Sequence, residues 1–181
     1  LAGALEMFEK GLAIAERLAR QDPANADWQE DLGVSYNRIG GVLEDEGNLA
    51  GAQEMFEKGF AIAEHLAEQD PANAGWQQSL SVSYNRIGGV LQTQGALAGA
   101  LEMFEKDLAI AERLAEQDPT NADWQQDLGV SYNLIGGVRQ KQGDLAGALE
   151  MYEKELAIVE CLAEQDPANV DWQQDLGVSY N

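Results

Sequence analysis

Cysteine and histidine are almost absent from this 181-residue chain, which contains one of each, Cys161 and His65. A single cysteine cannot form an internal disulfide, so the fold does not depend on an oxidising compartment and we expect a cytoplasmic protein. His65 has no second metal ligand or nucleophile at a useful spacing, and its position in the repeat described below is Arg or Cys elsewhere. The sequence therefore predicts no catalytic residue, no metal site and no cofactor, and hence a protein that is not an enzyme.

Basic residues are also scarce, with 11 Lys and Arg against 32 Asp and Glu, and the net charge is −21. This charge makes contact with nucleic acid or an anionic membrane unfavourable, so we expect protein or peptide partners that are neutral or basic. A simpler explanation is that the charges lie on solvated helix faces and serve solubility.

Long apolar runs are missing as well: none approaches the roughly 18 residues needed to span a bilayer, and no basic-then-apolar leader is present. The chain starts at Leu1 without a methionine and stops at Asn181, midway through a repeat. We expect it to be a fragment of a longer protein.

What the chain does contain is a repeat with a period of 48 residues. Blocks 49–96 and 97–144 are identical at 36 of 48 positions. This period predicts a single repeat array over residues 1–181, with repeats at about 1–48, 49–96, 97–144 and a truncated 145–181. The four tryptophans and the four prolines show the same spacing: Trp28, Trp76, Trp124 and Trp172; Pro23, Pro71, Pro119 and Pro167.

Each repeat contains two helical patterns. The first, here the A helix, runs from about Asp27 to Glu46, and the second, the B helix, from about Ala50 to Gln69. In both, apolar residues recur three or four positions apart, as on one face of an amphipathic helix. The turns between them allow only antiparallel neighbours. The array is thus predicted to hold one B helix, three A–B pairs and a truncated A helix from about Asp171.

Cap residues support these boundaries. Gly47 is expected to end an A helix in a left-handed conformation. Asn48 and Asp144 can cap the following B helix, whereas Ala96 at the equivalent position cannot, which weakens that junction by roughly 1 kcal/mol. The expected N-caps of the A helices are Asn25, Asn73, Asn121 and Asn169.

Glycines inside the A helix need a packing reason, since each costs about 1 kcal/mol relative to alanine. One set lies beside the isoleucines of the apolar stripe, and a second set lies seven residues earlier. We expect helices A and B to approach closely at both sets, so that the same kind of contact occurs twice, two turns apart. The sets are Gly40, Gly88 and Gly136; Gly33, Gly129 and Gly177.

The small and large residues of this pattern resemble the tetratricopeptide repeat. The matching positions are Ile39-Gly40, Gly47-Asn48-Leu49, Ala52 and Phe56, closed by Asp70-Pro71. The family's usual period is 34 residues, so the 14 additional residues lengthen each helix by seven, or nearly two turns. The chain is similar in this to long-helix relatives such as the kinesin light chain repeats. Trp28 and Leu32 belong to the added turns, where we expect them to pack against a B helix.

The resemblance implies an all-α fold, a right-handed superhelical α-solenoid of antiparallel helix hairpins. It also implies that the A helices line a concave face where members of the family bind peptides or partner helices. On this sequence that face is expected to hold Glu30, Val34, Asn37, Gly41 and Glu44; Gln78, Val82, Asn85, Gly89 and Gln92; Gln126, Val130, Asn133, Gly137 and Gln140.

Two interpretations of this face remain open. Ladders of Gln and Asn over a glycine floor could hydrogen-bond an extended peptide backbone, with the valines as a shallow apolar strip. Alternatively, these side chains are ordinary solvated helix surface. The family's carboxylate-binding version uses basic groove residues, and here only Arg38, Arg86 and Lys141 lie near, while Leu134 replaces arginine in the third repeat. Recognition of a free C-terminal carboxylate is not expected.

Three functions are compatible with such an array. The first is a non-enzymatic protein-interaction module, a scaffold or recognition arm that uses the A-helix face. The second is a sensor or regulatory arm of an enzyme whose catalytic domain lies outside this fragment. The third is a structural array that self-associates head to tail through uncapped ends.

Overall fold

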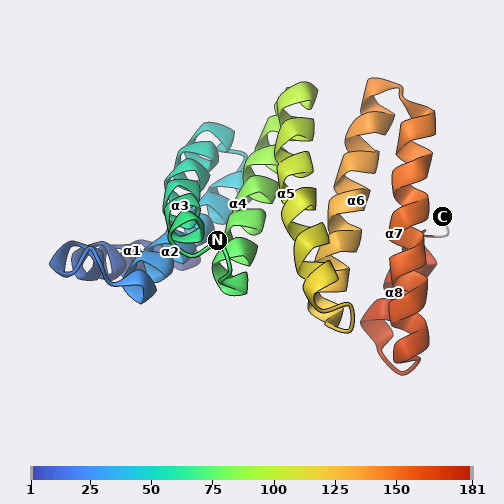
Figure 1. Ribbon diagram of the computed structural model, residues 1–181. Helices are drawn as coiled ribbons and strands as arrows, with labels where there is room; N and C mark the ends of the chain where they lie inside the picture. The colour runs from blue at the N-terminus through green and yellow to red at the C-terminus, as the bar shows by residue number, and fades with distance from the viewer. Residues whose placement is uncertain (1, 180–181) are drawn as a thin grey trace. The chain divides into compact units, whose positions relative to one another are not determined.

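The computed structural model describes residues 2–179, in which there are eight helices and no strand (Figure 1). The chain divides into two compact units, Leu1–Gly95 and Ala96–Asn181, and each is described by itself. The boundary falls at the end of the second predicted repeat. The all-α repeat of antiparallel hairpins is confirmed, whereas a single continuous array over 1–181 stays a prediction.

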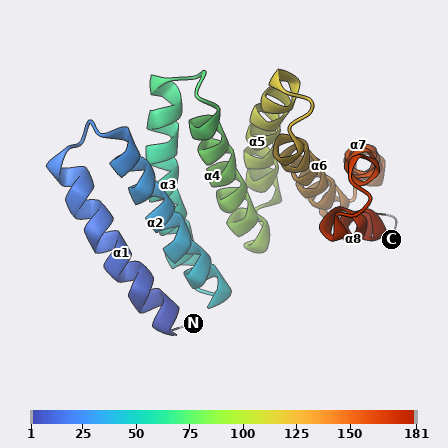
Figure 2. The same cartoon turned by 90° about the horizontal axis from the view of Figure 1, so that it is seen from below.

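The first unit contains α1 (Ala2–Gln21), α2 (Ala26–Asp45), α3 (Leu49–Gln69) and α4 (Ala74–Thr93). The second contains α5 (Leu97–Gln117), α6 (Ala122–Gln142), α7 (Leu145–Gln165) and α8 (Val170–Ser179). Odd-numbered helices are the predicted B helices and even-numbered helices the A helices, with ends within about two residues of expectation. Within each unit, helices consecutive in the chain pack side by side (Figure 2).

The predicted caps are present. Asn25 accepts a hydrogen bond from the Trp28 amide at 3.1 Å, and the other three repeats have the same contact. Asn48 and Asp144 cap α3 and α7, whereas Ala96 leaves α5 without a side-chain cap. Gly47 has a φ of 78° and ends α2 in the left-handed conformation, as expected.

The core of each unit lies between the A and B helices around small residues and one aromatic ring per repeat. Phe56 and Phe104 are fully buried. A Cβ at Gly40 would lie 2.5 Å from the Phe56 ring, and one at Gly136 would lie 2.7 Å from the Tyr152 ring. The close approach predicted for this set of glycines is therefore confirmed at both positions.

The second set of glycines does not repeat that contact, so the prediction of one contact used twice was wrong. A Cβ at Gly33 would lie 3.6 Å from the Ile62 side chain, which is ordinary van der Waals distance, and Gly129 faces Ile158 at 3.7 Å. The difference is that an aromatic ring faces Gly40, whereas Gly33 faces the Ile62 side chain at 3.6 Å and the Gly59 carbonyl oxygen at 3.7 Å.

The tryptophans pack beside the B helices without being fully buried. Trp28 shares a depression with Ile14 and Leu18 of α1, so it does lie beside a B helix, but all four tryptophans are half-buried. Truncation of Trp28 should consequently cost less than the roughly 3–5 kcal/mol expected for a fully buried ring.

Candidate functional site

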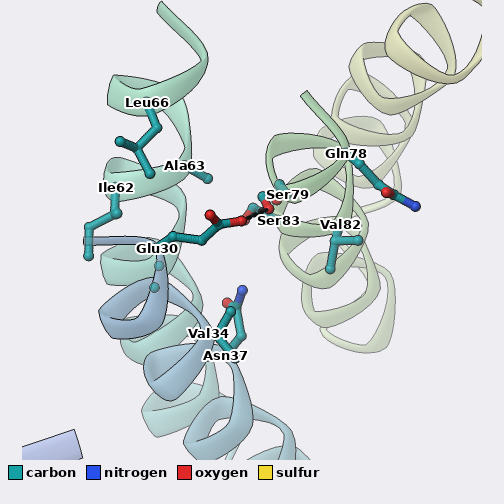
Figure 3. Close-up of a pocket in the computed structure, with 12 residues that line it drawn as sticks. Glu30, Val34, Asn37, Ile62, Ala63, Leu66, Gln78, Ser79, Val82 and Ser83 are labelled. Carbon is teal, nitrogen blue, oxygen red and sulfur yellow. Dashed lines mark hydrogen bonds between the residues drawn. The ribbon is translucent and has the colours of Figure 1, made fainter. Parts of the chain in front are cut away.

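A pocket of about 260 Å³ lies in the first unit where α2, α3 and α4 meet (Figure 3). Ile62, Ala63 and Leu66 of α3 form its apolar back. Val34 of α2 and Val82 of α4 line it from the two A helices, and these valines are 41% and 43% exposed. The pocket exists because consecutive A helices lie on the same side of the B helix between them.

Polar groups at this pocket come from the A helices. Figure 3 shows the Glu30 side chain extending from α2 toward Ser79 and Ser83 of α4. The Ser79 hydroxyl donates to Glu30 Oε1 over a long 3.4 Å. Ser83 is fully buried and donates to its own helix, to the Ser79 carbonyl oxygen at 2.9 Å. The Glu30 carboxylate thus retains most of its acceptor capacity.

The second unit has a pocket of about 300 Å³ at the equivalent place, formed by α6, α7 and α8. Its lining residues are related to those of the first pocket by 96 residues, or two repeats: Ile158, Val159 and Leu162 form the back, and Val130 and Val178 the flanks. The charged groups differ, because Glu155 replaces Gly59, Asp175 replaces Ser79 and Gln126 replaces Glu30.

The structure brings about half of the predicted A-helix residues to these cavities. The first pocket is lined by Glu30, Val34, Asn37, Gln78 and Val82, and the second by Gln126, Val130 and Asn133. Gly41 lines an adjoining depression of about 370 Å³ together with Arg38 and Arg86. The remaining predicted residues line neither pocket: Glu44, Asn85, Gly89, Gln92, Gly137 and Gln140.

The three asparagines do not form a uniform ladder. The side-chain oxygens of Asn37 and Asn85 are buried and without a hydrogen-bond partner, whereas Asn133 is exposed. Asn37 Oδ1 lies 2.6 Å from the place that a Cβ of Gly59 would take. Opposite Asn133, Glu155 of α7 takes the position of Gly59, where a side chain would meet an asparagine placed as Asn37 is.

Sequence reasoning missed the B-helix position that holds Gly11, Gly59, Asp107 and Glu155 in successive repeats. Asp107 is fully buried, and its Oδ2 accepts a hydrogen bond from Ser131 Oγ at 2.6 Å. Glu155 accepts one from Ser179 Oγ at 2.8 Å. The available signal was the serine itself, which recurs in every A helix opposite a position that varies between Gly and an acid.

Two tyrosines have shifted pKa values. Burial, with a hydrogen bond of 3.0 Å to Glu112 and its negative charge, raises the pKa of Tyr132 to about 12. Burial and Glu16 likewise raise the pKa of Tyr36. Both hydroxyls join an A helix to the preceding B helix and line neither of the two pockets, so these shifts belong to helix packing.

Among residues 2–179, no group of three or more His, Cys, Asp or Glu side chains is placed to hold a metal ion. His65 and Cys161 are exposed, and each lies beside a glutamine one turn later. Within the same residues, no helix combines the length and apolar character required to cross a bilayer.

The family model for the tetratricopeptide repeat matches residues 80–120. Among solved structures, the chain is similar to BtubC (BKLC) from P. vanneervenii, with a TM-score of 0.69 and 18% identity over 99% of this chain and 65% of that one. It is also similar to the N-terminal domain of stress-induced protein-1 (STI-1) from C. elegans, with a TM-score of 0.51 and 14% identity over 84% of this chain and 98% of that domain. No curated protein sequence matches. The chain thus spans less than two thirds of the BtubC chain, and at these identities the likeness concerns the fold alone.

Proposed function

We propose that this chain, which matches the tetratricopeptide-repeat model over residues 80–120, is a non-enzymatic protein-interaction module that binds an extended peptide on its A helices. The observation that carries the proposal is the recurrence of one pocket at equivalent positions of both units. Packing alone does not require such a pocket to stay open.

The valines at its rim support a binding role. Val34, Val82 and Val130 occupy the same repeat position and are 41%, 43% and 46% exposed. A helix surface selected only for solubility would carry polar residues there. Within each unit, the two valines at this position, beside Gln or Glu, instead offer a short apolar strip for side chains of an extended peptide.

The size of the pockets favours a peptide over a small molecule. Sites for drug-sized ligands are usually about 300–1,000 Å³ and enclose most of the ligand. Pockets of about 260 and 300 Å³ open to solvent have room for a single side chain each. Binding energy would then accumulate over several weak contacts along the chain of the partner.

The test is a screen of immobilised extended peptides against the whole chain, followed by Val82→Lys. This exposed residue contributes little to the core, so the variant should fold as the wild type does, by circular dichroism. We expect at least a tenfold loss of affinity for any captured peptide, because a charge would occupy the apolar strip. Ala61→Lys, at an exposed residue of α3 that lines neither pocket, is the matched control. Equal effects of the two variants would place the binding elsewhere and refute the proposal.

A further inference from the structure

We propose that each pocket receives a lysine or arginine side chain of the bound peptide, with the apolar stem between the two valines and the charged group at the pocket carboxylates. The inference rests on the proposed function, since it names the chemistry of the partner that the same face would bind. It commits to a basic segment of an extended polypeptide as the occupant.

The walls of both pockets suit a long unbranched stem. In the first unit, Val34 and Val82 flank an opening backed by Ile62 and Leu66. Lysine and arginine commonly place their methylene groups on such apolar surface while the charged end stays near water or a counter-ion. A short polar side chain would leave these walls uncovered.

The charged residues that line the two pockets are all acidic. The first is lined by Glu30 and the second by Glu155 and Asp175, and no Lys or Arg lines either of them. The acidic residues differ between the units in helix and position, yet each pocket retains at least one carboxylate. Both sites thus carry negative charge, as does the chain with its net charge of −21.

Two basic residues line the depression beside the first pocket, which shares Val34 and Val82 with it, but not the pocket itself. Arg38 and Arg86 line the adjoining depression with Asp45, and the Arg86 guanidinium lies over the Phe56 ring at 6.0 Å. In the second unit, Leu134 takes the repeat position of Arg38. The Glu30 carboxylate accepts only the long hydrogen bond from Ser79. The charged group of a lysine or arginine could donate to the same carboxylate at a shorter distance than the Ser79 hydroxyl does.

The experiment uses the whole chain and three peptides that differ in one residue: acetyl-Ser-Val-Ser-Lys-Ser-Val-Ser-amide and its versions with norleucine or Glu in place of Lys. Binding is followed by the ¹³C-methyl NMR shifts of Val34 and Val82 for the first pocket and of Val130 for the second. We expect the Lys peptide to bind about fivefold more tightly than the norleucine peptide, as for a half-exposed ion pair, and the Glu peptide to bind most weakly. The preference for Lys should shrink at 0.5 M salt.

The variant Glu30→Gln tests the residue directly. It introduces the glutamine found at this repeat position in the other three repeats, so the fold is expected to tolerate it. In this variant, the affinities measured from the Val34 and Val82 methyl signals should no longer favour the Lys peptide over the norleucine peptide. The affinities measured from the Val130 signal should still favour it. Glu68→Gln is the control with the same change of net charge, at an exposed residue of α3 that does not line the pocket.

The outcomes separate the two proposals. This inference would be overturned, while the binding face stands, by any of three results. The Lys and norleucine peptides bind with equal affinity, the Glu peptide binds more tightly than the Lys peptide, or Glu68→Gln changes binding as much as Glu30→Gln does. If no peptide shifts the valine methyl signals and the peptide screen captures nothing, both proposals fail.

Discussion

Gly40 lies where the ring of Phe56 comes closest to the backbone of α2. A Cβ at Gly40 would overlap the ring at 2.5 Å, whereas a Cβ at the neighbouring Gly41 would meet nothing within 4 Å. The two glycines are adjacent in sequence but face different surroundings, one the core and the other the depression beside the first pocket.

We therefore predict that Gly40→Ala destabilises the protein by about 1–3 kcal/mol, because the core is overpacked. Gly41→Ala should stabilise it by up to about 1 kcal/mol, because alanine is the better helix former and has free space. The free energy of unfolding from urea titration distinguishes them. Similar values for the two variants would contradict the close packing of α2 on α3.

The raised pKa of Tyr132 predicts how the stability of the protein depends on pH. Its pKa of about 12 in the folded protein lies above the ordinary value near 10, owing to burial and then to Glu112. The folded state holds this proton more tightly than the unfolded state, so the stabilisation is fully present below pH 10 and is lost as the pH rises to 12.

Tyr132→Phe should consequently lower the free energy of unfolding most at pH 9, and the difference from the wild type should vanish toward pH 12. Urea titrations across this range, with absorbance at 295 nm to follow the phenolate, check it. A difference that stays constant with pH would show that the two states do not differ in the tyrosine pKa.

At the scale of the helix, the caps set where each element begins. Ala96 precedes α5 with φ −79° and ψ 60°, close to the −81° and 69° of Asn48 before α3. Asparagine fits this backbone, so Ala96→Asn is expected to stabilise the protein by about 1 kcal/mol. Asn48→Ala should cost a similar amount. Thermal unfolding of both variants tests the pair, and a destabilised Ala96→Asn would be the unexpected result.

The helices were predictable from the sequence because their apolar spacing, caps and turn residues agree with one another. The lining of the pockets was predictable only in part. Val34, Val82 and Val130 recur at one position of the amphipathic A helices; the first two line the first pocket and Val130 lines the second. Asn37 and Asn85 recur in the same way, yet their side-chain oxygens are buried. For Asn37 the reason is Gly59 on the facing B helix, which leaves room for the amide.

At the scale of the whole molecule, the two main features are the negative net charge and the repeated pairs of helices. Ion pairs such as Lys58–Glu54 and Lys106–Glu102 lie on exposed helix faces one turn apart and contribute little to stability. Stability in each unit comes instead from helices packed on their sequence neighbours. Such an architecture responds to damage locally.

A local response is testable with Gly40→Ala. Amide hydrogen exchange should become faster in α2 and α3, whereas exchange in α6 and α7 should keep its wild-type rate. Loss of protection throughout residues 2–179 would instead show one cooperative unfolding unit.

The sequence by itself determined the class of fold, the eight helices within residues 2–179, their caps and the resemblance to the tetratricopeptide repeat, because these depend on local preference and on a period repeated four times. Only the tertiary structure decided which glycines are tightly packed, how deeply Trp28 lies and that Asp107 pairs with Ser131 in the core. The reason is physical: each depends on the size of the side chain that the facing helix presents, and the period fixes which positions face each other without fixing how much space lies between them.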